Sequence, residues 1–310
     1  MRAAIIDLGT NTFNLLIADV DKKGIKEFVY KAKMPSKLGQ DGINKSILHQ
    51  DAMDRGVKIL KEYKKIIDKH MVDKIYAYAT SAIRTAINGE EFVQCVQKET
   101  GINVIIISGK EEAALIFKGV QQSVKELQDS YLIVDIGGGS TEFVLVENDE
   151  ITWLRSYPLG MARLLERFKP SEPITAIEIS KIEQFLELEL KDLITAIKGK
   201  KIDTLVGSSG SFDTILSMVS HYFFSPGTFK KNFSTEIKRE HFSHLYNIII
   251  QTNLEERKEM PGMDLLRVDM MVLAMVFTHF IMGKLGIFHL YQTKYALKEG
   301  ILFKISEDLK

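Results

Sequence analysis

The sequence has almost no cysteine: Cys95 is the single one among 310 residues, so no disulfide can form within the chain. Such a chain is typical of proteins that work in a reducing cytosol, and we expect a cytoplasmic location. Charge of one sign is also missing, because 41 lysines and arginines balance 41 aspartates and glutamates. We therefore expect no nucleic-acid partner and no anionic membrane surface, and an anionic ligand must be bound by a local cluster of donors.

Long apolar runs are scarce as well. The most hydrophobic segment, residues 270–283, is shorter than the ~20 residues that a membrane-spanning helix needs, and it contains Thr278 and His279. We expect a buried helix there, with His279 as a core histidine. The opening stretch, MRAAIIDLGTN, reaches Asp7 and Gly9 before an apolar core long enough for a secretory signal has accumulated. The sequence therefore predicts neither a membrane span nor a secretion signal.

The chain does contain an internal repeat. The segments IIDLGTNTFNLLIADVDKKGI and IVDIGGGSTEFVLVENDEI share one plan of apolar strand, aspartate, glycine turn and second strand, and their aspartates, Asp7 and Asp135, are 128 residues apart. The segments AYATSAIRTAI, from Ala77, and LVGSSGSFDTI, from Leu205, repeat the same offset. Two matches in one register indicate two similar α/β halves.

The helical patterns divide between these halves. Apolar residues at helical spacing predict helices over residues 50–69 and 174–198, and a further helix is expected from Ser108 to about Ser123. We place the domain boundary near residue 122, where this last helix ends in polar residues. This boundary gives a first domain of residues 1–122 and a second of residues 123–293.

The second copy of the repeat carries a glycine loop, DIGGGSTE. Three glycines, Gly137–Gly139, follow a strand and its aspartate, so several backbone amides can converge on one anion, and Ser140 and Thr141 add hydroxyl donors. The loop lacks both the Walker spacing and the dinucleotide fingerprint. A plain hairpin turn would explain it equally well. The duplicate loop, DLGTNT, would turn the pair into a clamp for phosphate.

Two other features suit a phosphate site. Asp7 and Asp135 each end a strand before a glycine loop, and magnesium prefers a few carboxylates together with water and phosphate oxygens. Arg84 is expected at the start of a helix, where the helix dipole disfavours a cation, so a phosphate contact would explain its position. The alternative for Arg84 is a surface ion pair with Glu90 or Glu91.

The stretch VIIISGKEEAALIF, residues 104–117, places Glu111 and Glu112 where a helix should begin. Carboxylates complement the dipole at a helix N-terminus, and for most such pairs that role is the whole explanation. A carboxylate beside a phosphate cleft could instead orient and deprotonate a water molecule. The local pattern does not decide between these two interpretations.

Taken together, seven motifs in this order resemble the exopolyphosphatase / guanosine pentaphosphate phosphohydrolase (Ppx/GppA) family: DLGTNT, TSAIRTA, ISGKEEA, DIGGGSTE, PLGMARLLERF, GSSGS and LLRVD. The resemblance spans nearly the whole chain. It implies the actin-like, sugar-kinase and Hsp70-type fold, an α/β fold of two RNase H-like domains with a cleft between them. It also implies that the C-terminal helix, residues 294–310, packs back on the first domain.

The resemblance assigns roles to individual residues. Glu112 is similar to the family's catalytic carboxylate, and Arg84 to its phosphate-binding arginine. It also implies a set of phosphate-binding residues: Asn11, Thr12, Gly137, Gly138, Gly139, Ser140, Thr141, Glu142, Gly210 and Ser211. Asp7 and Asp135 would hold Mg²⁺, with K⁺ as an optional monovalent cation.

The activity implied is release of terminal phosphate from polyphosphate, guanosine pentaphosphate or both by an activated water, and a homodimer is one option for its assembly. The chain ends soon after YALKEGILFKI, so it resembles a short form without the C-terminal HD-type domain. Asn14, Lys37, Ala296 and Lys298 depart from the family pattern, which affects chain-length and nucleotide preference. The alternatives are an actin-fold kinase that uses ATP and a non-catalytic sensor of guanosine tetra- or pentaphosphate.

Overall fold

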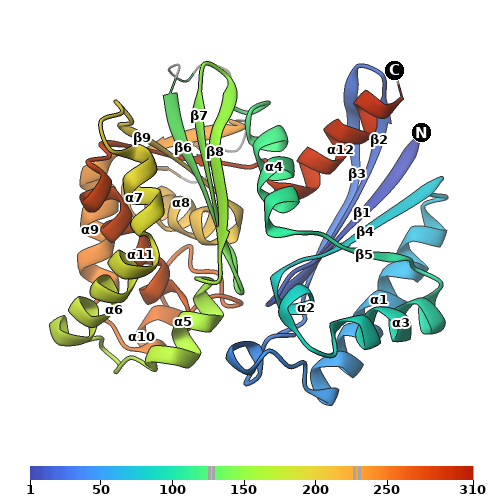
Figure 1. Ribbon diagram of the computed structural model, residues 1–310, viewed down its shortest axis with the longest axis horizontal. Helices are drawn as coiled ribbons and strands as arrows, with labels where there is room; N and C mark the ends of the chain where they lie inside the picture. The colour runs from blue at the N-terminus through green and yellow to red at the C-terminus, as the bar shows by residue number, and fades with distance from the viewer. Residues whose placement is uncertain (125–126, 128–129, 226–227, 230–231, 310) are drawn as a thin grey trace.

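A computed structural model describes residues 1–124, 127, 130–225, 228–229 and 232–309. Two β-sheets stand side by side, each with helices on its outer face, and two further helices lie between them (Figure 1). The first sheet has the strand order β3-β2-β1-β4-β5. Its strands are β1 (Arg2–Leu8), β2 (Thr12–Asp21), β3 (Gly24–Pro35), β4 (Lys74–Ala79) and β5 (Val104–Ile106).

The second sheet repeats the first. Its order is β10-β11-β9-β6-β7-β8, so β8-β7-β6-β9-β11 corresponds to β3-β2-β1-β4-β5, with β10 added at the edge. Its strands are β6 (Ser130–Ile136), β7 (Thr141–Glu147), β8 (Glu150–Tyr157), β9 (Thr204–Ser208), β10 (Ser234–Ile237) and β11 (His289–Thr293). In both sheets the first three strands are antiparallel and the next pairs parallel to the first. The two similar α/β halves predicted from the repeat are confirmed, as is the fold of two RNase H-like domains that the family resemblance implies.

The strand register shows that individual residues of the repeat occupy equivalent positions in the two sheets. β1 and β6 are apolar runs buried on both faces, as central strands should be. Asp7 pairs with Asn14 across β1 and β2, and Asp135 pairs with Glu142 across β6 and β7. Since cross-strand partners share one face of a sheet, each aspartate has a polar neighbour at the end of its strand.

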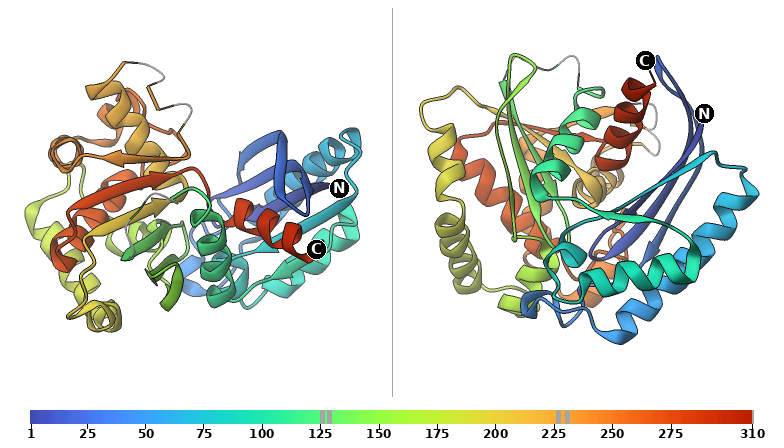
Figure 2. Two further views of the ribbon diagram at one scale, coloured as in Figure 1. Left: turned by 90° about the horizontal axis from the view of Figure 1, so that it is seen from above. Right: turned by 45° about the vertical axis from the view of Figure 1, so that its right-hand side comes forward.

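Helices cover the outer faces (Figure 2). The first sheet is covered by apolar side chains of α1 (Gln50–Lys69) and α3 (Gly89–Thr100), and the short elements η1 (Ile43–Lys45) and α2 (Ser81–Thr85) complete this half. The helices of the second half are α5 (Met161–Phe168), α6 (Ala176–Glu189), α7 (Lys191–Ile197), α8 (Ser209–Phe223), α9 (Arg239–Ile249), α10 (Leu254–Lys258) and α11 (Met271–Leu285).

The two central helices are α4 (Gly109–Val120) and α12 (Leu297–Asp308), which pack against each other. α12 also contacts β1, β2 and β3, and α4 contacts β7 and β8, so one apolar cluster includes residues from both sheets. The boundary near residue 122 stays a prediction; it falls after α4, between the two sheets. Residue 310, the end of the expected C-terminal segment, lies outside the described residues.

Two expectations about the helices are wrong. The single helix expected over residues 174–198 is divided at Leu190, whose backbone leaves helical geometry between α6 and α7. His279 is exposed rather than buried, and its ring stacks on Tyr246 with centroids 4.2 Å apart. An aromatic face supplies a partner to this histidine without burying it. Within the described part of the chain, no helix is long and apolar enough to cross a membrane.

Candidate active site

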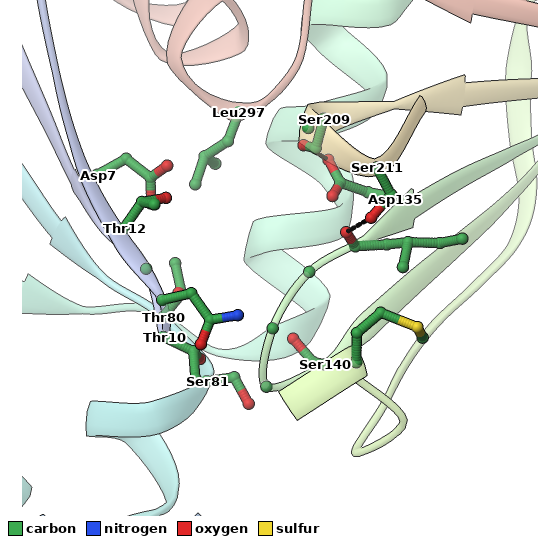
Figure 3. A pocket seen from close by; sticks show the side chains of 18 of the residues that line it. Asp7, Thr10, Thr12, Thr80, Ser81, Asp135, Ser140, Ser209, Ser211 and Leu297 are labelled. Atoms are coloured by element: carbon green, nitrogen blue, oxygen red, sulfur yellow. Dashed lines mark hydrogen bonds between the residues drawn. The ribbon is translucent and has the colours of Figure 1, made fainter. Parts of the chain in front are cut away.

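A pocket, partly open to solvent, lies where the carboxyl ends of β1 and β6 face each other. Figure 3 shows Asp7 and Asp135 on opposite walls, with Ser81 and Ser140 at one end and Leu297 at the other. Ligands in α/β folds commonly bind beyond the carboxyl ends of the strands. The duplicated sheets thus bring two loops and two aspartates to one cavity.

The second glycine loop presents bare amides to this pocket. The carbonyls of Gly137 and Gly138 accept hydrogen bonds from the first amides of α5, from Met161 N at 3.0 Å and Ala162 N at 2.8 Å. The Gly139 carbonyl accepts from Arg163 Nε at 2.8 Å. Because C=O and N–H point in opposite directions across a trans peptide, the next amides, Gly138 to Ser140, turn toward the pocket. These three amides donate to no acceptor among the described residues.

Backbone hydrogen bonds hold the carbonyls of the first glycine loop in a similar way. The Thr10 carbonyl accepts from Leu38 N at 2.7 Å, and the Asn11 carbonyl accepts from Ser36 N at 2.9 Å. The amides that follow these carbonyls therefore face away from that segment. The loops touch, since a Cβ added at Gly139 would lie 2.4 Å from Thr10 Oγ1. Only glycine allows this approach, so the two loops can clasp one small anion between them.

Glu112 and Arg84 form an ion pair at the pocket. Arg84 NH1 lies 2.7 Å from Glu112 Oε2 and donates to the Ile107 carbonyl at 3.1 Å. Glu112 Oε1 accepts no hydrogen bond from any residue that the structure describes. Burial raises the pKa of Glu112 to about 7, although the Arg84 guanidinium opposes this shift. A carboxylate with such a pKa, one oxygen held and the other free, is suited to accept a proton near neutral pH.

Three more carboxyl groups line the pocket. Burial raises the pKa of Glu142 well above its ordinary value, and the charges of Glu112 and Asp135 add to this effect. Burial also raises the pKa of Asp7 and of Asp135. Asp135 Oδ2 accepts from Ser208 Oγ at 2.8 Å and from Ser209 Oγ at 2.6 Å. Four carboxyl groups around one pocket, three of them buried and Asp7 half-buried, leave negative charge that a cation would compensate.

Asp7 and Asp135 are the residues that could hold a divalent cation. They face the pocket from opposite walls, and burial favours their neutral forms, so a cation between them would stabilise both charges (Figure 3). Within the described residues no group of three or more His, Cys, Asp and Glu side chains has metal-binding geometry. Two carboxylates are a donor set that magnesium can use, because magnesium keeps several water ligands and takes phosphate oxygens.

The structure brings together most of the residues predicted from the sequence. Twelve of the predicted site residues line the pocket: Asp7, Asn11, Thr12, Glu112, Asp135, Gly137, Gly138, Gly139, Ser140, Glu142, Gly210 and Ser211. Arg84 lines an adjoining groove that shares Ser81 and Ser140 with the pocket. Thr141 is the exception, because its buried hydroxyl donates to the Leu159 carbonyl at 3.0 Å.

The expected position of Arg84 at the start of a helix is wrong. Arg84 lies in the last turn of the short helix α2, where a cation suits the helix dipole. The pairing with Glu90 or Glu91 is wrong as well, because the recorded partner is Glu112. The arginine is therefore held at the pocket by the candidate base and not by a surface carboxylate.

Sequence reasoning missed two cations. Arg267 lines the pocket, packs against Gly210 and pairs with Asp264. Burial alone would lower the pKa of Lys298, but the nearby carboxylates, including Asp7 and Asp135, outweigh it and raise the pKa. A signal existed for both residues, since Arg267 belongs to the LLRVD motif and Lys298 departs from the family pattern.

Comparisons with known proteins agree with this geometry. The model of the Ppx/GppA phosphatase family matches residues 16–308. A bifunctional 3-dehydroquinate synthase/phosphatase of Fusobacterium nucleatum is 33% identical over 286 residues, which are 87% of this chain but only 41% of that longer protein. Exopolyphosphatase 1 of Mycobacterium leprae is 26% identical over 305 residues, which are 98% of this chain and 89% of that protein.

Solved structures show the same relationship. An exopolyphosphatase from Cytophaga hutchinsonii superposes with a TM-score of 0.95 at 33% identity, covering 100% of this chain and 99% of that chain. The Aquifex aeolicus member of the Ppx/GppA family has a TM-score of 0.82 at 27% identity, covering 100% of this chain and 99% of that one. This chain belongs to the Ppx/GppA phosphatase family.

Proposed function

We propose that this chain is an exopolyphosphatase that releases the terminal phosphate of inorganic polyphosphate by attack of a water molecule. The observation that carries the proposal is Glu112, a buried carboxyl group with a pKa of about 7 and a free oxygen, in a pocket that is also lined by both glycine loops. Amides and a base around one small cavity provide the two things that phosphoryl transfer needs, which are positioning and charge stabilisation.

In this mechanism the terminal phosphoryl group lies between the two glycine loops. A water bound at Glu112 Oε1 attacks the terminal phosphorus and gives its proton to Glu112. The bond from that phosphorus to the bridging oxygen breaks, and its electron pair stays on the shortened chain. Amides of Gly138 to Ser140 stabilise charge on the non-bridging oxygens, and Arg84 contacts the next phosphate.

Magnesium held by Asp7 and Asp135 would neutralise part of the charge on substrate and pocket. Without a cation, the four carboxyl groups of the pocket would repel a polyanion. Lys298 and Arg267 offset this repulsion only in part, because each already faces carboxylates of its own. A requirement for K⁺ and a homodimeric assembly remain separate predictions.

The names of the relatives support polyphosphate as the substrate class, since exopolyphosphatases of Mycobacterium leprae and Cytophaga hutchinsonii are among them. Guanosine pentaphosphate ends in a similar phosphoanhydride and is the alternative substrate. A kinase would need an acceptor hydroxyl, and a sensor would bind guanosine phosphates without turnover. Retention of a buried carboxyl group with a free oxygen favours hydrolysis over both.

Phosphate release from the purified protein tests the proposal. With polyphosphate, Mg²⁺ and no acceptor present, we expect steady release of phosphate that stops when a chelator is added and resumes with excess Mg²⁺. Guanosine pentaphosphate is measured in parallel to rank the two substrates. Binding of guanosine phosphates without release from either compound would favour the sensor, and release that depends on an added acceptor would favour the kinase.

A further inference from the structure

A second groove adjoins the pocket and is lined in part by Arg84. The two cavities share Ser81 and Ser140 in their linings, so they adjoin at these two residues. The walls of the groove come from α2, the start of α4 and β8, and its remaining lining residues are Arg84, Thr85, Gly109, Lys110, Leu154, Arg155, Ser156 and Pro158. No residue of β8 was predicted as a site residue.

Lys110 is the least expected residue in this groove. It is the second residue of α4, where the positive end of the helix dipole disfavours a cation. It is exposed, and no ion pair joins it to any residue within the described ranges. A lysine that opposes its own helix and has no carboxylate partner adds nothing to stability. Its charge is therefore available to an anion in the groove.

The other lining residues include two more cations, Arg84 and Arg155, and each pairs with a carboxylate that lies outside the lining. Arg155 on β8 is fixed by an ion pair with Asp192 and lies over the Tyr157 ring, with its guanidinium carbon 5.1 Å from the ring centre. A Cβ added at Gly109 would lie 2.5 Å from Ser156 Cβ, so glycine lets the start of α4 approach β8 closely in this groove. Among the described residues that line the groove there is no carboxylate and no aromatic ring.

We propose that this groove binds the part of a polyphosphate chain behind its terminal phosphate, with Lys110 and Arg155 as the residues that favour long chains. Three cations without a carboxylate in the lining fit a repeating anion. A guanine base would find no ring on which to stack there. This inference rests on the proposed function for turnover, but binding of a polyanion in the groove does not depend on hydrolysis.

The test compares Lys110→Gln with the unchanged protein on long-chain polyphosphate and on tripolyphosphate, which is short enough to lie mainly in the pocket. We expect KM for the long chain to rise about 3- to 10-fold, as for loss of one partly exposed charged contact, while KM for tripolyphosphate changes less than about twofold. The turnover number should not change. Removing this charge from the start of α4 does not oppose the helix dipole, so folding should be preserved.

Lys181→Gln is the matched control, because Lys181 is an exposed lysine of α6 outside the groove and the substitution removes the same charge. It should leave both KM values unchanged. Equal changes with both substrates, or none, would overturn the groove assignment. Equilibrium binding of fluorescently labelled long-chain polyphosphate separates the groove assignment from the proposed function. Weaker binding by Lys110→Gln, with no turnover by any variant, would refute the proposed function alone. Unchanged binding by Lys110→Gln would refute the groove assignment.

Discussion

Helices α4 and α12 occupy corresponding positions in the two halves of the molecule but have different roles. α4 follows β5 and α12 follows the corresponding strand β11. Each helix has Lys-Glu at its second and third positions, and each glutamate accepts a hydrogen bond from the backbone at its helix start. Ser108 N donates to Glu111 at 2.8 Å, and Ala296 N donates to Glu299 at 3.0 Å. The repeat has thus preserved the device that starts the helix in both halves.

The next position separates the two helices. In α4 it is Glu112, which faces the pocket; in α12 it is Gly300, which faces α4. A Cβ at Gly300 would lie 1.8 Å from the Leu115 carbonyl oxygen, so α12 uses this position to approach α4 closely. One copy supplies the candidate base and the other supplies the packing that holds its helix. A duplicated framework can therefore host one active centre instead of two.

Substitution of Glu112, which has no carboxylate counterpart in α12, should have the largest effect on activity. Glu112→Gln preserves size and leaves an amide oxygen that Arg84 can still contact, but the amide cannot take a proton from water. We expect kcat to fall about 10²- to 10⁴-fold, the usual value of general-base assistance. Binding of polyphosphate should persist, because the loop amides and Arg84 remain, and equilibrium binding to the inactive variant measures it.

The pH profile of the unchanged protein supplies the control for this prediction. Glu112 must be ionised to act as a base, and its pKa is raised to about 7, so kcat should increase as the pH rises through about 7. The rise should be missing from any residual activity of Glu112→Gln. A rate in Glu112→Gln close to that of the unchanged protein, with the same pH profile, would exclude Glu112 as the base.

Substitution of Gly300, the α12 residue at the position of Glu112, should affect stability instead. Gly300→Ala places a methyl group against the backbone of Leu115 and Gly119, which cannot move cheaply in a packed helix pair. We expect a loss of about 1–3 kcal/mol or more, measured as a lower midpoint of thermal unfolding.

Gly283→Ala in α11 is the matched control for this loss. It is the same substitution within a helix, but nothing lies within 4 Å of the added Cβ. It should raise the midpoint slightly, because alanine favours helix over glycine by up to about 1 kcal/mol. A fall of equal size in both variants would mean that the close contact between α4 and α12 does not matter.

The repeat made the fold predictable. Helix α1 occupies the expected residues 50–69, and the offset between Asp7 and Asp135 reappears as matching strands. Local patterns of this kind depend on residues close in sequence or on a duplication that can be read directly. The break at Leu190 was missed because apolar spacing continues through it.

The pocket was harder to predict in detail, because its charges come from distant segments. Lys298 meets Asp7 and Asp135 only after α12 has returned to the first sheet. Arg84 lies at the C-terminal end of α2, so the helix dipole favours its charge instead of disfavouring it. The sequence alone does not show where so short a helix ends. The roles of Glu112, Arg84 and the loop residues stay predictions, whereas their meeting around one pocket and its groove is observed.

The smallest effect is expected at Glu111, which has the same position in α4 as Glu299 has in α12. Glu111 is exposed, and hydrogen bonds from the hydroxyl and amide of Ser108 hold its pKa below the ordinary value, so its stabilising effect is lost as the pH falls through that lowered pKa. Glu111→Gln keeps a capping side chain that can accept from Ser108 N, and loses only a charge at the helix N-terminus. We expect unchanged kcat and a stability loss of at most about 0.5 kcal/mol at neutral pH, measured by thermal unfolding. If Glu111→Gln is inactive while Glu112→Gln keeps its rate, the base is Glu111, and the contrast between an exposed helix cap and a buried catalytic carboxylate is reversed.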